Sequence, residues 1–574
     1  MTTVARMLVT SLAEAGVTTI WGVVGDALNP VTDAIRTEDR IEWIGVRHEE
    51  AGAFAASAQA QLTGTLGVCA GTVGPGSIHL LNGLYDAKKS HAPVLAICGQ
   101  VPREELGSDF FQEVDNDQVF ADVAVFTRTV SDPAQAPLLV EQAVNAALQQ
   151  EGVAVLTLPG DIGDLDIPKG TATPSFVTAQ PSTMPSAEDV ASVAAVLNAA
   201  ENVTLLVGLG ARDAHDDVLA IADILAAPMV VTLKAKEDFD EDNPFEVGQS
   251  GLIGNPAAQQ AFEDCDVLFL VGTDFPYREW YPEGKTVIQL DKRGAYVGRR
   301  THVAHALVGH CAPTLAALRP QLVAKSSRDH LDSARHKYDD WRERQSHLAE
   351  PDYDHEHLGV IRKVLDNPEH AIRPEAVAAS IDRHAAADAI FTTDTGMSTV
   401  WLSRFVRVTG DRRLIGSFNL GSMANAMPQA LGAASLDRRR QVVAFCGDGG
   451  LTMLMGDLIT AVTYDLPVKL IVFDNSRLGM VKLEQEQGGL PEFGTVLHNP
   501  DLAAVARACG LHGVRVESPD ELDGAIAEAL AHRGPVLLDV VTNPDEISIP
   551  GRTSVGQAWG FAIAKVKETL ESRS

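Results

Sequence analysis

The sequence predicts an α/β protein built from three doubly wound parallel-sheet domains. Its 574 residues exceed what one hydrophobic core usually organises, so three domains of somewhat under 200 residues each are expected. An apolar fraction of 45% with 21% charged residues is typical of a globular chain. Short apolar runs alternate with Ala-rich helical stretches, and this alternation indicates parallel sheets with helices on both faces.

The first predicted domain spans residues 1–180. Its strand candidates are the apolar runs 18–24, 66–70, 93–98 and 153–158. Residues 167–185 then collect Pro, Thr, Ser and Gly without any period, which predicts a connecting segment.

The second predicted domain spans residues 186–325, and the third spans residues 373–545. Residues 326–372 are charged and rich in histidine, but these histidines lack convergent ligand spacing, so we expect a surface linker. Residues 546–574 form a C-terminal tail. The strand candidates of the two domains are 203–207, 229–232, 267–271, 286–290, 441–446, 468–473 and 536–541.

Charge and cysteine usage exclude several classes of protein. A formal net charge of −31 argues against binding DNA or RNA, because a phosphate-binding surface needs clustered Lys and Arg. The six cysteines are scattered without any CxxC, which predicts reduced thiols and no zinc site. The N-terminus has no signal-peptide pattern, and no apolar run has membrane length. We therefore expect a cytoplasmic protein.

The strongest local motif is Gly447-Asp448-Gly449-Gly450, which follows the apolar run 441–446. Asn475 follows the next apolar run, so both polar residues are expected at one edge of a parallel sheet. Oxygens of Asp448, Asn475 and the Arg477 backbone suit Mg²⁺. The glycines let a phosphate approach, and a helix expected to begin near Leu451 would direct its N–H groups at it. Taken alone, the same residues also fit an ordinary turn.

This pair of motifs resembles the signature of thiamine-diphosphate enzymes, and the resemblance covers nearly the whole chain. It is most similar to the pyruvate oxidase and quinone-reducing pyruvate dehydrogenase family, within the acetolactate synthase-like superfamily. The resemblance implies that the three domains are, in order, pyrimidine-binding, FAD-binding and diphosphate-binding. Glu49, directly after His48, matches the family's cofactor-activating glutamate, although His-Glu-Glu at a helix start also fits a solvated cap.

The resemblance implies two sets of cofactor residues. Gly208 and Gly210 alone form only a weak GxG motif. The resemblance to an FAD domain rests on the order and spacing of the other residues of the FAD set. Asp448, Asn475 and Arg477 would hold the metal. The thiamine diphosphate set is Glu49, Gly421, Ser422, Met423, Asp448, Gly449, Gly450, Asn475, Ser476, Arg477, Leu478, Gly479, Met480 and Val481. The FAD set is Gly208, Gly210, Arg212, Ser250, Gly251, Leu252, Ile253, Thr273, Asp274, Phe275, Pro276, Tyr277 and Asp291.

The implied function is oxidative decarboxylation of pyruvate to acetate and CO2, with electrons passing through FAD to a quinone. Phe111, Gln112, Met480, Val481 and Glu484 match positions that line the substrate pocket. The resemblance also implies a homo-oligomer, usually a tetramer, in which Glu49 of one subunit meets the diphosphate site of another. The alternatives are a carboligase of the acetolactate synthase type with structural FAD, a phosphate-dependent oxidase using oxygen, and a catalytically silent subunit.

Some positions depart from the family pattern. Asp474 stands where relatives often have a first asparagine, and His310 stands where they commonly have aspartate. Asp26 would repel phosphate, which favours release of acetate over acetyl phosphate. The C-terminal tail is shorter than the lipid-binding tail of membrane-activated relatives, so we expect at most weak peripheral contact with the inner face of the cell membrane.

Overall fold

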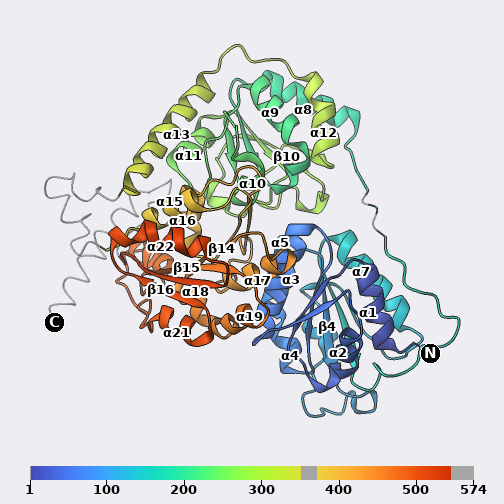
Figure 1. Ribbon diagram of the computed structural model, residues 1–574. Helices are drawn as coiled ribbons and strands as arrows, with labels where there is room; N and C mark the ends of the chain where they lie inside the picture. The colour runs from blue at the N-terminus through green and yellow to red at the C-terminus, as the bar shows by residue number, and fades with distance from the viewer. Residues whose placement is uncertain (1, 178, 180, 351–370, 545–574) are drawn as a thin grey trace.

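A computed structural model describes residues 2–177, 179, 181–350 and 371–544. These residues form three parallel sheets of six, five and six strands, each with helices on its faces (Figure 1). The predicted fold class, three parallel-sheet α/β domains, is confirmed. The prediction for the tail 546–574 lies outside the described residues.

The first sheet has the strand order β2-β1-β3-β4-β6-β5. Its strands are β1 Thr19–Gly22, β2 Glu42–Gly45, β3 Gly67–Gly71, β4 Val94–Gln100, β5 Ala124–Thr129 and β6 Val153–Pro159. Its helices are α1 Val4–Glu14, α2 Asn29–Arg36, α3 Glu49–Thr63, α4 Pro75–His79, α5 Leu81–Ser90, α6 Asn116–Val119 and α7 Ala136–Gln150.

The second sheet has the order β11-β10-β9-β7-β8. Its strands are β7 Val203–Val207, β8 Met229–Val231, β9 Val267–Val271, β10 Thr286–Asp291 and β11 His305–Val308. Its helices are α8 Ala187–Ala199, α9 His215–Leu225, α10 Lys236–Phe239, α11 Pro256–Asp264 and α12 Cys311–Leu318, and α13 Asp329–Leu348 follows them.

The predicted linker 326–372 contains helix α13 in its described part, and residues 351–370 lie outside the described residues. Leu331, Ala334 and Tyr338 recur at helical spacing and are buried against the central unit. The stretch is otherwise so polar that these three positions gave no visible apolar stripe in the sequence. None of the helices in the described part of the chain is both long and apolar enough to cross a membrane.

The third sheet has the order β13-β12-β14-β15-β17-β16. Its strands are β12 Ile390–Thr393, β13 Arg413–Gly416, β14 Val442–Gly447, β15 Val468–Asp474, β16 His512–Val516 and β17 Val536–Val541. Its helices are α15 Pro374–His384, α16 Met397–Phe405, α17 Ala426–Leu436, α18 Asp448–Met453, α19 Leu458–Thr463, α20 Gly479–Gln487, α21 Leu502–Cys509 and α22 Pro519–Ala531.

The first and third units share one hydrophobic core across helices α3 and α17, which lie side by side between them in Figure 1. Gly432 allows the close approach, since a Cβ there would lie 2.3 Å from the carbonyl oxygen of Ala55. Buried polar groups join the helices as well: the Gln59 amide donates to Thr19 Oγ1 and to Ser435 Oγ, at 2.6 and 2.8 Å. This contact fixes how the loops at the starts of α3 and α17 sit relative to each other.

Candidate functional site

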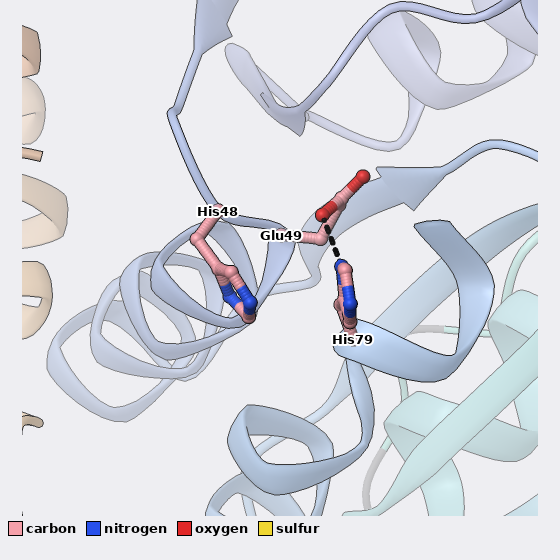
Figure 2. Close-up of side chains that lie close together, drawn as sticks. All are labelled: His48, Glu49 and His79. Atoms are coloured by element: carbon pink, nitrogen blue, oxygen red, sulfur yellow. Dashed lines mark hydrogen bonds and ion pairs between the residues drawn. The ribbon is translucent and has the colours of Figure 1, made fainter. Parts of the chain in front are cut away.

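Glu49 is the first residue of α3, and its side chain is only 8% exposed. Its Oε2 lies 3.0 Å from Nδ1 of His79, at the end of α4 (Figure 2). The carboxylate also lies against the start of α4, where a Cβ on Gly76 would be 3.1 Å from Oε1. The carboxyl group expected to exchange a proton is therefore held by one imidazole in a nearly enclosed place.

His48, Glu49 and His79 bring three possible metal-ligating atoms within 4.8 Å of one another. The two imidazole rings are stacked, however, with centroids 4.4 Å apart and planes inclined by only 26°. An imidazole binds a metal ion in the plane of its ring, so two nearly parallel rings cannot both reach one ion unless a ring rotates. As it stands, the arrangement suits hydrogen bonding to Glu49.

Two contacts tie the start of α3 to the third unit. Asp457, just before α19, accepts hydrogen bonds from the backbone N–H groups of Arg47 and His48 at 2.7 and 3.2 Å. Asn82 donates to Glu50 Oε1 at 2.7 Å and to Ser422 Oγ at 2.9 Å. The loop that carries Glu49 is thereby positioned by residues of both units.

A pair of buried carboxylates lies at the carboxyl ends of β14 and β15. One amide nitrogen, Nδ2 of Asn499, donates to Asp448 Oδ2 at 2.7 Å and to Asp474 Oδ1 at 2.8 Å. Burial and the charge of Asp474 raise the pKa of Asp448. Two carboxylates in one buried place are stable beside a cation, and oxygen ligands of this kind suit Mg²⁺.

The neighbouring Asn475 turns its side-chain oxygen toward the backbone N–H of Arg477, at 3.0 Å. Helix α18 begins at Asp448, earlier than the predicted start near Leu451, and has only six residues. The N–H of Gly449, in the first turn of this helix, donates to Asp448 Oδ1 at 2.8 Å. The prediction that N–H groups of this helix meet a phosphate therefore concerns the groups that follow Gly449.

Gly449 and Gly450, here called the glycine cradle, lie so close to neighbouring segments that a side chain at either position would clash. A Cβ on Gly449 would lie 2.8 Å from Leu478 Cδ2 and 3.3 Å from Met423 Cε. A Cβ on Gly450 would lie 2.3 Å from Asp394 Oδ2. The structure therefore brings together residues of the predicted thiamine diphosphate set that are far apart in the sequence.

Asp394, after β12, ties the two loops of this cradle together. Its carboxyl group accepts hydrogen bonds from the backbone N–H groups of Ala426 and Gly447, at 2.9 and 3.1 Å. Burial raises the pKa of Asp394 to about 7. The segment from Gly421 to Ala424 bends through positive φ at both of these residues, so its backbone groups turn away from a helical path.

A cavity of about 510 Å³ is lined by residues of all three units, most of them from the central one. Every residue of the predicted FAD set except Gly251 lines it. Gly251 has a φ of +88° and packs against Phe275 and Tyr277. The cavity wall continues to Gly421 and Met480, which belong to the predicted thiamine diphosphate set. His310 also lines it, and its Nδ1 accepts from the backbone N–H of Thr183.

The predicted substrate residues fall into two groups. Met480 lines the cavity, and Tyr277 lies in the same wall. The pKa of Tyr277 is raised by burial first, and then by the charges of Glu279 and Glu484. Val481 is exposed beside them. Phe111 is 78% exposed on a loop of the first unit, and the Gln112 carbonyl packs against Gly74. Among the described residues, no hydrogen bond, ion pair or ring contact is seen between Phe111 and Met480, Val481 or Glu484.

Sequence reasoning missed five residues that hold this site: His79, Asn82, Asp394, Asp457 and Asn499. Each is a polar residue whose partner comes from a distant segment; Asp457 and Arg47 are 410 positions apart. A spacing pattern cannot show such a contact. Only the apolar run before Asp394, which we did not select as a strand, could have drawn attention to that carboxyl.

Family models match three parts of the chain. They are the N-terminal TPP binding domain of thiamine pyrophosphate enzymes at residues 2–119, their central domain at 190–318, and their C-terminal TPP binding domain at 394–540. The matched ranges contain β14 and β15, which precede Asp448 and Asn475, whereas β5, β6 and β12 lie outside them.

Curated relatives match over nearly the full length. The chain is 37% identical to the thiamine pyrophosphate-containing protein YdaP of Bacillus subtilis, over 100% of this chain and 97% of that protein. It is 32% identical to pyruvate oxidase of Lactiplantibacillus plantarum, over 92% and 87%. It is 31% identical to the acetolactate synthase large subunit of Parasynechococcus marenigrum, over 95% and 88%.

Proposed function

Because the chain belongs to the thiamine pyrophosphate enzyme family, with all three of its domains, we propose that it oxidatively decarboxylates pyruvate to acetate and CO2. The proposed cofactors are thiamine diphosphate, Mg²⁺ and FAD, and the proposed electron acceptor is a quinone. The prediction of the family is confirmed at the level of thiamine-pyrophosphate-dependent enzymes.

The residues present fit the cofactors. Asp448 and Asn475 would bind Mg²⁺ with the Arg477 carbonyl, and the Gly449–Gly450 cradle would receive the diphosphate. Thiamine diphosphate, when bound, supplies the electron sink for decarboxylation, and FAD accepts two electrons. Glu49 would hold and return a proton at the pyrimidine, while His79 keeps its carboxylate in place.

The proposal of an oxidative reaction rests on one observation. A single cavity is lined by the predicted FAD residues and by Gly421 and Met480 of the predicted thiamine diphosphate set. A flavin in this cavity would lie next to the reacting cofactor, as electron transfer requires. This supports a redox role for FAD over a purely structural one.

The acetolactate synthase relative supports a second candidate, a carboligase, with nearly the same identity as the pyruvate oxidase. The third candidate is a phosphate-dependent oxidase, and the charge of Asp26 argues against it. Asp26 is exposed at the turn after β1, and its carboxylate accepts only from the neighbouring Ala27 N–H in the described structure. Its negative charge there opposes binding of phosphate.

We further propose that the active unit is a homo-oligomer, a tetramer by the family resemblance. Large apolar side chains are exposed near both halves of the site: Phe111 and Val24 on the first unit, and Phe493 and Leu490 on the third. Covering them with a second copy would remove apolar surface from water. A location in the cytoplasm, with at most peripheral membrane contact, belongs to the same proposal.

The test is an anaerobic absorbance record of the cofactor-loaded protein after addition of pyruvate. We expect the oxidised flavin band to bleach and a soluble quinone to restore it. A Glu49→Gln variant loaded with the same flavin should keep its colour. Consumption of pyruvate by the wild type without bleaching would establish the carboligase instead.

A further inference from the structure

The pair of carboxylates at Asp448 and Asp474 is held by one side chain from a separate loop. Both acidic residues accept from the same Nδ2 atom of Asn499. An amide nitrogen carries two hydrogens, so this atom has no further hydrogen to donate. The two carboxylates are therefore fixed relative to each other, and Asp448 is left with its remaining lone pairs for a cation.

The loop that carries Asn499 is itself joined to the Asn475 turn. The backbone N–H of Leu497 donates to the Ser476 carbonyl, and that of Leu478 donates to the Thr495 carbonyl, both at 2.8 Å. These bonds form a short antiparallel contact next to Asn475. Asn499 is thus placed by the same backbone that presents the predicted metal ligand.

Asp474 adds a negative charge next to the predicted metal ligands but is not one of them. Its Oδ2 lies 3.5 Å from Nη1 of Arg515, and the same nitrogen lies 2.6 Å from Asp539 Oδ2. Glu517 also contacts this guanidinium, with its Oε1 2.7 Å from Nε, so three carboxylates share Arg515 and it neutralises the charge of Asp474 only in part. Negative charge consequently remains beside Asp448.

We propose that Asn499 and Asp474 are positioning residues of the cation site, in which Asn499 orients the Asp448 carboxylate and Asp474 adds negative charge that strengthens binding of a divalent cation. This inference rests on the proposed function, because it concerns the same site. Residues that orient metal ligands typically contribute 10- to 100-fold to affinity. The charge of the surrounding groups also tunes affinity for hard cations.

The experiment measures Mn²⁺ binding to the full-length protein by electron paramagnetic resonance, in the presence of saturating thiamine diphosphate. The variants are Asn499→Leu and Asp474→Asn, and Asp501→Asn is the matched control. Asp501 lies in the same loop and caps α21 through its side chain, and asparagine preserves such a cap while removing one charge.

We expect Asn499→Leu to weaken Mn²⁺ binding by about 10- to 100-fold and to change the spectrum of the bound ion. We expect Asp474→Asn to weaken binding by roughly 10-fold with an unchanged spectrum, because charge is lost and the ligands stay oriented. Asp501→Asn should bind like the wild type. If Asn499→Leu does not fold, Asn499→Ala removes the same amide with a smaller side chain and tests the orienting role, while Asp474→Asn tests the charge, since relatives often have asparagine there. Wild-type affinity and spectrum in the Asn499 variant would contradict the orienting role.

Wild-type affinity in Asp474→Asn, or an equal loss in Asp501→Asn, would overturn the inference while leaving the proposed function intact. Absence of any Mn²⁺ binding by the wild type would instead contradict the proposed cofactor site. The two failures are therefore distinguishable in one series of titrations.

Discussion

The first and third units have the same strand order, and they differ in the loops at the ends of equivalent strands. Numbered within each unit, both sheets run 2-1-3-4-6-5. The second strand of the first unit leads into α3, which begins with Glu49, and the second strand of the third unit leads through Gly421 and Met423 into α17. The first loop presents the carboxylate of Glu49, and the second presents backbone groups of a segment with positive φ at Gly421 and Ala424.

The third strands show the same contrast. After β3 come Gly74 and, at the start of α4, Gly76, which lie against Gln112 and Glu49. After β14 comes Asp448, the first residue of α18, which shares Asn499 with Asp474. A single topology thus presents one buried carboxylate in the first unit and a pair of buried carboxylates in the third, and the difference is set by the segments that follow equivalent strands.

The largest expected effect is that of replacing Glu49, the carboxyl group at the start of α3 in the first unit. Glu49→Gln should lower turnover by about 10²- to 10⁴-fold, because the amide cannot exchange a proton as the carboxyl group does. Steady-state rates with saturating cofactors measure this. Glu50→Gln is the control, since Glu50 bonds to Asn82 and should retain most activity. Equal losses in both variants would remove the assignment to Glu49.

The contact between the two units is tested by adding one methyl group. Gly432→Ala should destabilise the protein by about 1–3 kcal/mol, since its Cβ would lie 2.3 Å from the Ala55 carbonyl oxygen. Gly524→Ala, in helix α22, meets no atom within 4 Å and should stabilise by roughly 0.5–1 kcal/mol. Urea unfolding midpoints that shift in the same direction would contradict this account of the interface.

Asp394 follows β12 at the position where the first unit has Val23 after β1. Its folded pKa of about 7 lies above the usual value for aspartate near 4, so between these pH values the folded protein binds a proton that the unfolded chain does not. This stabilising contribution is complete below about pH 4 and is lost as the pH rises through 7.

Asp394→Asn should therefore cost about 1–3 kcal/mol at pH 5, and less at pH 8. Chemical denaturation at the two pH values measures the difference. Asp520→Asn, exposed in the first turn of α22, should show no such dependence. A loss that is larger at pH 8 than at pH 5 would reverse the sign of the argument.

The smallest effect is expected for one hydrogen bond across the α3–α17 contact. Ser435→Ala leaves one amide hydrogen of Gln59 without its partner and should cost about 1 kcal/mol. Ser346→Ala, at an exposed position of α13, should change stability by less than about 0.5 kcal/mol. Thermal unfolding of the two variants side by side measures this, and indistinguishable midpoints would show that Gln59 finds another acceptor.

Sequence patterns predicted the interior strands better than the edges. The runs at β4, β9, β14 and β15 are buried throughout or nearly so, and their continuous apolar sequences were recognised. The missed strands include β2, β5, β11 and β16, which lie at sheet edges and are mostly only partly buried. The short strands β12 and β13 were missed as well, although most of their residues are buried. An edge strand meets solvent, so its residues do not form an apolar run.

The residues of the candidate site could likewise be predicted only where a local sequence pattern marked them. Asp448 and Asn475 were found because each directly follows an apolar strand, so a local pattern marked both. Asn499 bonds to Asp448 from 51 positions away, and His79 reaches Glu49 from 30 positions away. Neither residue follows a recognised strand, and only the folded chain shows their partners.

The shared core of α3 and α17 has a consequence for synthesis of the chain on the ribosome. Gln59 emerges 376 residues before its partner Ser435. At elongation rates of roughly 5–20 residues per second, the apolar face of α3 would wait for roughly 20 to 75 seconds. During this interval a chaperone or a transient cover would protect the nascent first unit, and its yield in the cell should depend on how quickly codons 60–435 are translated.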